Sequence, residues 1–391
     1  MVTKKRCDLF ILQSSLEGGG AERIGVELMT SMPESVKRLL VVIKGTNTPC
    51  YLPNTTQIHY LSQPHRLRNF AYIIFPFVII RYFGLVIKYR PKIVLSILPL
   101  DNVINLCLSS IFKIKPLISA HGIRSYSGSS ILTRSLVKLE QLLLRYTNGE
   151  LIAVTSAVKD DVIENFRIPG KKIHVLYNPI DTKKIATLAL EPVTDIQIRS
   201  DVKRIVTVGR LTDVKGQWHL IRVFSELSKV FSVELLIIGE GIERKYLEEL
   251  VDNCGIRDKV SFLGWKENPY KYVARSNLFV LTSLSESFGN VLVEAMAVGC
   301  PVISSRCSDG VVEIIGSDNY YGIVTEKMSG IRYAANEPLD CGERELLNAI
   351  VNTLSDTELC DLLSSRGKER ADFFGREKGI SAYTALIRRY L

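Results

Sequence analysis

Two glutamates, Glu286 and Glu294, are the residues of this 391-residue chain whose types and spacing most directly suggest chemistry. Gly289 and Asn290 lie between them and favour the turn and cap that open a helix, and the apolar run at 278–284 is typical of a buried parallel strand. The free amides at such a helix start favour a bound phosphate, and carboxylates accept hydrogen bonds from hydroxyl groups. The segment therefore predicts a charged ligand rich in hydroxyls, such as a nucleotide sugar. The alternative is an ordinary strand, turn and helix with both glutamates in solvent.

A second candidate site follows the predicted strand at 204–209. Gly209 lets the backbone approach a ligand closely, and Arg210 and Lys215 follow where a phosphate would lie. Negative charge develops on a diphosphate when a sugar–phosphate bond breaks, so two cations at this position would stabilise the transition state. The alternative is a pair of surface cations after a turn.

Glycines and a histidine at other strand ends give weaker signals. Gly241 closes a G-x-G, but Arg244 stands where a dinucleotide-binding fingerprint needs glycine, which argues against a dehydrogenase. The glycine triplet at 18–20 precedes a predicted helix and is the stronger candidate for phosphate binding. His121 follows the predicted strand at 116–120 and either contacts the ligand or is structural. No D-x-D and no other grouping has metal-ligand spacing, so we expect no metal and no other cofactor.

The composition is that of a folded globular protein, with 46% hydrophobic and 23% charged residues, and the length allows two domains. The first residues offer no small-residue cleavage site, so we expect no secretory signal and a cytoplasmic protein. The eight cysteines include no C-x-x-C pair and no Cys/His cluster, which indicates reduced thiols.

Positive charge is concentrated in the first half of the chain. Residues 1–180 contain 23 Lys and Arg against 11 Asp and Glu, whereas the remainder contains 27 against 30. A basic half favours an anionic membrane or a lipid phosphate as partner, and we expect no nucleic acid because no nucleic-acid-binding motif is present. Four cations lie in or near a helix predicted at 131–146, and we expect them to face an anionic membrane or else to form a solvated helix face; they are Arg124, Arg134, Lys138 and Arg145.

Apolar runs alternate with helical patterns along both halves, which predicts an α/β protein with two parallel sheets covered by helices. The predicted strands are 7–12, 39–43, 93–98, 116–120 and 151–154 in the first half, then 204–209, 233–238, 260–263, 278–281 and 301–304. Predicted helices include 21–29, with Ile24, Leu28 and Met29 on one face, as well as 217–230, 245–254 and 380–391. Residues 181–203 are predicted to be the linker.

One segment, 69–88, is almost long enough and apolar enough to cross a bilayer. Pro76, Arg81 and Gly84 argue against that interpretation, since a charge near the bilayer centre is costly. We favour a helix that packs on the sheet or dips into a membrane interface, because the strand at 93–98 needs a crossover helix before it.

Several motifs in order resemble the family 4 glycosyltransferases, which have the two-domain GT-B fold. They are Gly-Gly-Gly-Ala-Glu-Arg at 18–23, Val-Gly-Arg-Leu at 208–211 with Lys215-Gly216, Phe-Leu-Gly at 262–264, Glu286-x7-Glu294 and Gly-Cys-Pro-Val-Ile at 299–303. One departure is Gly310-Val-Val-Glu313, where many members have Gly-Pro-x-Glu.

The resemblance implies two Rossmann-like domains that face each other across a cleft. Residues 1–182 and a returning helix at 377–391 would bind the acceptor, and residues 200–376 would bind the donor. It implies metal-independent transfer, with retention, of a hexose or N-acetylhexosamine from a nucleotide diphosphate sugar, with UDP favoured. With the basic half, it suggests a lipid-linked saccharide acceptor and a protein peripheral on the inner face of the cell membrane.

The resemblance also implies roles for individual residues. Arg210 and Lys215 would hold the diphosphate and Glu294 the ribose. Glu286 would hold the donor sugar, together with the amides of Phe288, Gly289, Asn290 and Val291. Gly19 and Gly20 would close on the diphosphate from the other domain, Gly209 and Gly241 would lie against the donor, and His121 would lie near its sugar. The leaving phosphate oxygen would accept the acceptor proton, so no protein nucleophile is needed.

Two other functions remain open: a nucleotide-sugar epimerase of the same fold, and a non-catalytic nucleotide-sugar-binding protein. Intact Arg210, Lys215, Glu286 and Glu294 favour an enzyme over the latter. Trp265 either flanks the nucleotide base or packs in the core.

Overall fold

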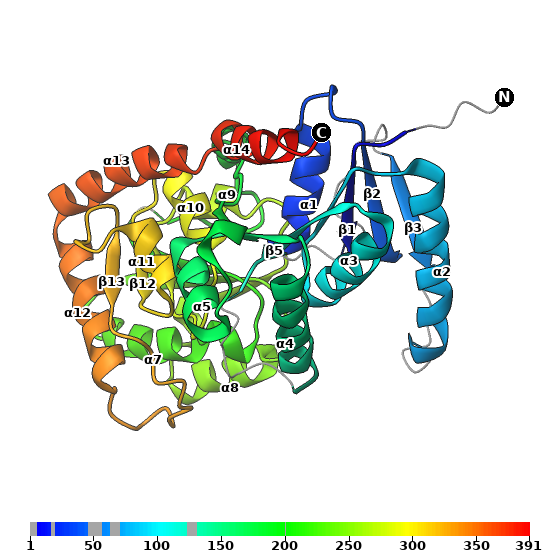
Figure 1. The fold of residues 1–391 in the computed structure, drawn as a ribbon. Coiled ribbons are helices and arrows are strands. Elements are labelled where there is room, and N and C mark those ends of the chain that lie inside the picture. Colours follow the sequence, from blue (N-terminus) through cyan, green and yellow to red (C-terminus); the bar gives the residue numbers. More distant parts are fainter. Residues whose placement is uncertain (1–5, 17–19, 46–56, 63–70, 123–130, 200) are drawn as a thin grey trace. The chain divides into compact units, whose positions relative to one another are not determined.

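The computed structural model describes residues 6–16, 20–45, 57–62, 71–122, 131–199 and 201–391. The chain forms two compact units (Figure 1). Unit 1 comprises residues 1–179 and 377–391, and unit 2 comprises residues 180–376.

Unit 1 contains a seven-stranded, fully parallel sheet with the strand order β3-β2-β1-β4-β5-β6-β7. Its strands are β1 (Leu9–Gln13), β2 (Arg38–Lys44), β3 (Ile58–Ser62), β4 (Ile93–Ser96), β5 (Lys115–Ala120), β6 (Glu150–Ala153) and β7 (Ile173–Val175).

Helices cover both faces of this sheet, and alternate residues of β1 contact the two layers. Leu9 and Ile11 pack in a cluster with α1 (Gly20–Ser31) and α14 (Arg376–Arg388). Phe10 and Leu12 pack in another cluster with α2 (Ala71–Tyr89) and α3 (Pro99–Phe112). Next to α3 lies α4 (Ile131–Tyr146), while α5 (Ser156–Phe166) contacts β6 and β7, and a 3-10 helix, η2, spans Gly170–Lys172.

Unit 2 contains a six-stranded parallel sheet with the order β10-β9-β8-β11-β12-β13. Its strands are β8 (Lys203–Val208), β9 (Val233–Ile238), β10 (Val260–Gly264), β11 (Leu278–Leu281), β12 (Val302–Ser305) and β13 (Ile323–Thr325). Its helices are α6 (Thr182–Ala189), η3 (Asp213–Lys215), α7 (Gln217–Leu227), α8 (Arg244–Asn253), η4 (Arg257–Lys259), α9 (Tyr270–Val273), α10 (Asn290–Ala297), α11 (Asp309–Ile315), α12 (Cys341–Ser355) and α13 (Thr357–Phe373).

A buried polar network joins α7 to α12 in unit 2. Arg222 Nε lies 3.0 Å from Glu343 Oε1, and both side chains are almost fully buried. The same guanidinium donates to three backbone carbonyls of the segment before α12, those of Ala334, Glu337 and Pro338. The network therefore fixes this irregular segment against α7.

The two parallel sheets with their covering helices confirm the predicted α/β architecture, and Ile24, Leu28 and Met29 are all buried as expected. The short strands β3, β7 and β13 were not predicted. The predicted linker at 181–203 is not an unstructured connection, because it contains α6 and is held to unit 2. Asn268 donates to the Leu188 carbonyl at 2.8 Å, and Lys266 pairs with Asp195 at 2.5 Å.

The segment at 69–88 contributes the helix α2, and no helix in the described part of the chain is long and apolar enough to cross a membrane. All seven described cysteines are free thiols, and Cys50 lies outside the described residues.

Candidate functional site

Lys215 and Glu286, which are 71 residues apart in sequence, meet at the carboxyl edge of the unit 2 sheet. From β8 the chain proceeds to β9 on one side and later returns to β11 on the other, so β8 and β11 flank the switch point at which such sheets bind ligands. Lys215 follows β8, Glu286 follows β11, and Lys215 Nζ donates to Glu286 Oε1. Ser283 Oγ donates to the same carboxylate oxygen at 2.8 Å. Both side chains of the ion pair are mostly buried, so the pair is held in place.

The loop after β8 is packed closely against the end of β11. Gly216 has a φ of +57°, and a Cβ there would lie 2.5 Å from the carbonyl oxygen of Thr282. The Leu284 amide donates to the Val214 carbonyl at 2.8 Å. Only glycine fits at position 216, and its close approach fixes the turn that presents Lys215.

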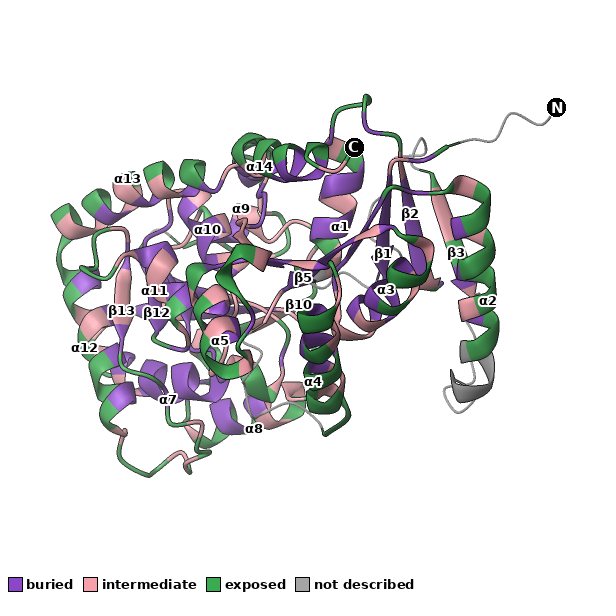
Figure 2. Ribbon diagram, in the orientation of Figure 1, coloured by how far each residue is buried: buried purple, intermediate pink, exposed green. Residues whose placement is uncertain are grey.

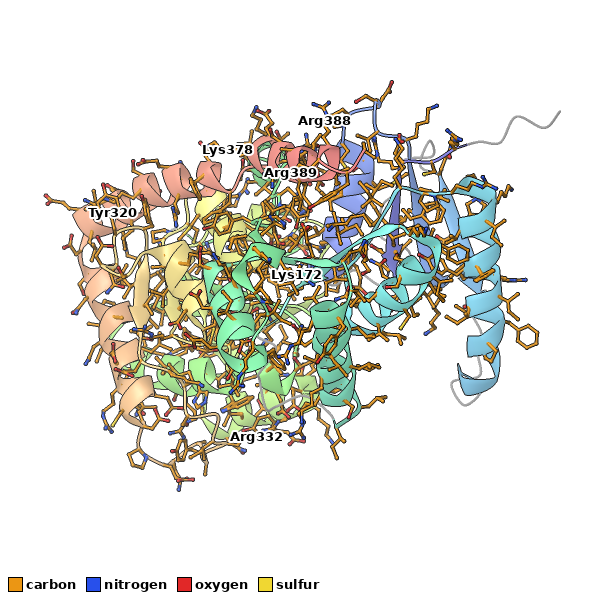
Figure 3. The ribbon with its side chains drawn as sticks, in the orientation of Figure 1. Lys172, Tyr320, Arg332, Lys378, Arg388 and Arg389 are labelled. Carbon is orange, nitrogen blue, oxygen red and sulfur yellow. The ribbon has the colours of Figure 1, made fainter. Side chains whose placement is uncertain are left out.

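Arg332, which is labelled in Figure 3, contacts the same turn from the segment before α12. Its guanidinium pairs with Asp213 of η3 and, at 2.9 Å, with Glu243. It also lies over the rings of Trp218 and Tyr246, 5.1 and 4.5 Å from their centroids. Arg332 lies in an irregular segment without a motif, so nothing in the sequence singles it out.

Two predicted glycines lie where the loop after β8 meets the loop after β9. Gly209 is covered by the Lys215 side chain, whose Cε would be 3.6 Å from a Cβ on that glycine. A Cβ on Gly241 would lie 2.1 Å from the Leu211 carbonyl oxygen. Gly241 therefore has a packing role within the chain, in addition to the donor contact that we predicted and that stays a prediction.

The N-terminus of α10 follows β11 at the same edge of the sheet. Gly289, with a φ of +86°, is the N-cap, and Asn290 is the first residue of the helix. Because glycine has no side chain, Gly289 itself supplies no side-chain cap to the first amides of α10. Phe288 is buried against Phe374, so its side chain has a structural role. Glu294 lies one turn into the helix and is partly buried.

Arg210 and Trp265 are both exposed at this edge. The Arg210 side chain is exposed, while its carbonyl accepts a hydrogen bond from Gln217 at 3.0 Å. Trp265 directly follows β10 and is 68% exposed, which rules out the packed core tryptophan that we considered. The buried core tryptophan is Trp218, at 1% exposed.

The predicted residues of unit 1 are only partly described. Gly20 opens α1, whereas Gly19 and Arg124 lie outside the described residues. His121 directly follows β5, and its Nε2 is 2.9 Å from Ser119 Oγ. On α4, Arg134, Lys138 and Arg145 are exposed, and Arg145 also donates to the Phe166 carbonyl.

Asp101, which was not predicted, holds the start of the glycine-rich loop. The Ser14 amide donates to Asp101 Oδ2 at 2.9 Å, and the Ser14 hydroxyl donates to Oδ1. Burial raises the pKa of Asp101 to about 7, although the hydrogen bonds from Ser14 lower it. In the sequence, a carboxyl group at the start of the apolar helix α3 could have drawn attention to Asp101. Its partner Ser14 lies 87 residues earlier, and no local pattern indicates that contact.

One cluster of possible metal ligands occurs in the described part of the chain, consisting of His219, Asp340 and Glu343. His219 Nε2 accepts the Gly330 amide at 3.2 Å, so Nδ1 carries the proton and donates to Glu343 at 2.8 Å. Asp340 caps α12 by accepting the Glu343 amide. Because both ring nitrogens are engaged, this cluster is part of the polar network of unit 2 and offers no histidine lone pair to a metal.

Comparison with known proteins identifies the family. The model of Glycosyltransferase Family 4 matches residues 18–184, and that of Glycosyl transferases group 1 matches residues 193–335. The N-acetylgalactosamine-N,N'-diacetylbacillosaminyl-diphospho-undecaprenol 4-alpha-N-acetylgalactosaminyltransferase of Campylobacter jejuni is 30% identical over 369 residues, 93% of this chain and 94% of that protein. The chain belongs to the family 4 glycosyltransferases. It is therefore an enzyme, a hexosyltransferase.

A second relative and two solved structures are also similar to this chain. The lipopolysaccharide core biosynthesis glycosyltransferase LpsD of Rhizobium meliloti is 32% identical over 197 residues, which cover 50% of this glycosyltransferase and 52% of LpsD. Anabaena HepE in complex with UDP-glucose has a TM-score of 0.76 at 19% identity, with 98% of this chain and 100% of HepE covered. WaaG, a glycosyltransferase involved in lipopolysaccharide biosynthesis, has a TM-score of 0.73 at 14% identity, with 97% and 99% covered. These likenesses show the GT-B fold.

Proposed function

We propose that this glycosyltransferase moves a hexose or N-acetylhexosamine from a UDP-sugar to a lipid-linked saccharide at the cytoplasmic membrane face, with retention and without a metal ion. The observation that carries this proposal is the Lys215–Glu286 pair, which lies at the sheet switch point beside the N-terminus of α10. A cation, a carboxylate and helix amides at one edge suit a ligand with phosphate and hydroxyl groups.

We assign the donor to unit 2. Arg210 and Lys215 hold the diphosphate, the amides from Phe288 to Val291 bind a phosphate oxygen, and Glu294 accepts the ribose hydroxyls. Trp265, exposed at the end of β10, lies at the same edge and would flank the base. The HepE structures with UDP and UDP-glucose, which share the fold, support UDP as the carrier.

Lys215 supplies the electrostatic stabilisation of the reaction. As the bond from the anomeric carbon to the phosphate oxygen breaks, negative charge grows on the β-phosphate, and Lys215 exchanges part of its interaction with Glu286 for this oxygen. The acceptor hydroxyl oxygen bonds to the anomeric carbon on the face from which the phosphate leaves, and its proton passes to the leaving phosphate oxygen, so the configuration is retained. Glu286 then accepts hydrogen bonds from the donor sugar. In this scheme the cations Arg210 and Lys215 balance the charge of the diphosphate, so no metal ion is needed.

We assign the acceptor to unit 1, which carries the excess positive charge. The Campylobacter jejuni relative is named for a diphospho-undecaprenol-linked saccharide, which supports an acceptor of this class. Exposed Arg134, Lys138 and Arg145 on α4 suit an anionic membrane and its diphosphate-linked lipids.

UDP release in the presence of lipid-linked acceptor tests the proposal. The variant Lys215→Ala should lose at least tenfold in turnover, as other enzymes do when such a stabiliser is removed. Lys245→Ala is a matched control, because the Lys245 side chain is 90% exposed on α8. Unchanged turnover in Lys215→Ala would remove this residue from the mechanism, and no UDP release from any UDP-sugar by the folded protein would refute the proposed reaction.

A further inference from the structure

The exposed large hydrophobic residues of unit 1 are concentrated on three neighbouring helices. Of the twelve such residues in the described part of unit 1, ten lie on α2, α3 and α4. They are Phe77, Ile80, Phe83, Ile87, Ile111, Ile131, Leu132, Leu139, Leu142 and Tyr146, with exposures from 38% for Phe83 to 77% for Ile131 and Tyr146. Soluble proteins rarely leave so many large apolar side chains close together in water.

The three helices form one layer over a single face of the sheet, so their outer sides point away from unit 1. The inner side of α2 is buried, with Val78, Tyr82 and Val86 in the cluster that contains Phe10 of β1. Crossovers from β3 to β4, from β4 to β5 and from β5 to β6 all run in one direction along the sheet, which places α2, α3 and α4 on the same face. Figure 2 shows exposed residues along the outer sides of α2 and α4.

A buried contact fixes which side of α4 faces outward. Asn102 of α3 donates to Glu140 Oε2 at 2.9 Å, and Glu140 is fully buried. Lys138 and Leu142 lie on the opposite side of the helix and are exposed. The outward side of α4 therefore combines basic and apolar residues.

The charges on this layer have one sign. The sequences of the three helices contain only two acidic residues, Asp101 and Glu140, and both are fully buried. Their exposed charged residues are all cations, namely Arg81, Lys88, Arg134, Lys138 and Arg145. A second copy of the same surface would bring cations against cations, whereas an anionic lipid surface complements both the charge and the apolar side chains.

We propose that the outer surface of α2, α3 and α4, here called the helix-layer surface, docks on an anionic bilayer and inserts its apolar side chains into the interface. The cations draw this surface to anionic headgroups, and Phe77, Ile80 and Ile87 along α2 enter the boundary between headgroups and acyl chains. The biological role of this docking rests on the proposed function, since docking would bring the protein to a lipid-linked acceptor. The exposed apolar and basic residues that define the surface do not depend on that function.

Co-sedimentation of the full chain with vesicles tests the docking surface. Wild-type protein should bind vesicles of phosphatidylglycerol and phosphatidylcholine better than vesicles of phosphatidylcholine alone, and added salt should weaken binding. The double variant Phe77→Ser/Ile80→Ser should lose roughly tenfold or more in partitioning, because two apolar side chains no longer enter the interface. The matched control is Leu190→Ser/Val230→Ser, which removes two exposed apolar side chains from unit 2.

Several outcomes would overturn the inference. The inference fails if wild-type protein binds neither kind of vesicle, or if the Phe77→Ser/Ile80→Ser variant binds vesicles as well as wild type does. It also fails if wild-type protein is a dimer that binds no vesicles and this variant is a monomer. Circular dichroism and the UDP-induced thermal shift should be the same in the variant and wild type, which shows that the variant is folded. Vesicle binding without UDP release would refute the proposed function and leave the docking surface standing.

Discussion

Replacement of Asp101 by asparagine should stabilise the protein at high pH, because the wild-type protein must then bury a charged carboxylate at this position. Burial raises the pKa of Asp101 from 3.8 to about 7, against the hydrogen bonds from Ser14 and the Leu98 backbone, and Glu22 of α1 raises it further. The Tyr82 hydroxyl of α2 also faces this group, and burial raises the pKa of that hydroxyl too.

The sign of the effect follows from proton binding. Between pH 3.8 and about 7 the folded state binds more protons at Asp101 than the unfolded state, so stability falls as the pH rises through this window and stays low above it. A shift of about three pKa units corresponds to a loss of about 4 kcal/mol in the free energy of unfolding. About 3 kcal/mol of this is lost between pH 5 and pH 8. Asp101→Asn cannot ionise, so it should gain this amount relative to wild type.

Urea denaturation at the two pH values measures this difference in the free energy of unfolding. The advantage of Asp101→Asn over wild type should grow by about 3 kcal/mol from pH 5 to pH 8. Asp160→Asn is the control, because Asp160 is exposed on α5 of the same unit. An advantage of the same size at both pH values would show that Asp101 does not titrate in this range and would refute the reasoning.

Three further substitutions test other parts of the account. Arg222→Met should cost about 3 to 5 kcal/mol by urea denaturation because it leaves Glu343 buried without its cation, and the double variant Arg222→Met/Glu343→Leu should cost less. Burial raises the pKa of Glu150, but three side-chain hydrogen bonds outweigh it and hold the pKa below its usual range, and Tyr390→Phe removes one of them. The variant should lose about 1 kcal/mol of unfolding free energy at pH 7. In thermal denaturation this loss should become smaller as the pH falls through the pKa of Glu150. Gly241→Ala should destabilise the protein by about 1 to 3 kcal/mol and weaken UDP binding in titration calorimetry, because its Cβ would lie 2.1 Å from a backbone carbonyl oxygen.

The sequence predicted most elements because local patterns determine them. The helix expected at 131–146 has those bounds as α4, and the five strands expected in unit 2 correspond to β8 through β12. The strand β13 has three residues, too few for a periodic pattern to show. The helix at 182–189 was missed because it has only eight residues, although Asp181 caps it locally by accepting the Lys184 amide; Asn268 also holds its end from a distant part of the chain.

The candidate site was predicted in its parts but not in its contacts. Glycines and charges at strand ends indicated Lys215 and Glu286 separately, and their pairing depends on β8 lying beside β11, which is a property of the strand order. The contact between Asp101 and Ser14 spans 87 residues and needs a buried environment that no local segment reveals. Arg332 was missed for the same reason, because its partners come from two other loops.

The central claim, that unit 2 binds a UDP-sugar with Glu294 at the ribose, is tested most directly by thermal stability in the presence of a panel of nucleotide sugars. One UDP-sugar at a hundredfold its dissociation constant should add about 2.7 kcal/mol of stability, and Glu294→Ala should lose this gain. Glu345→Ala, an exposed position on α12, should keep it. No gain with any nucleotide sugar, or an equal gain in Glu294→Ala, would contradict the account.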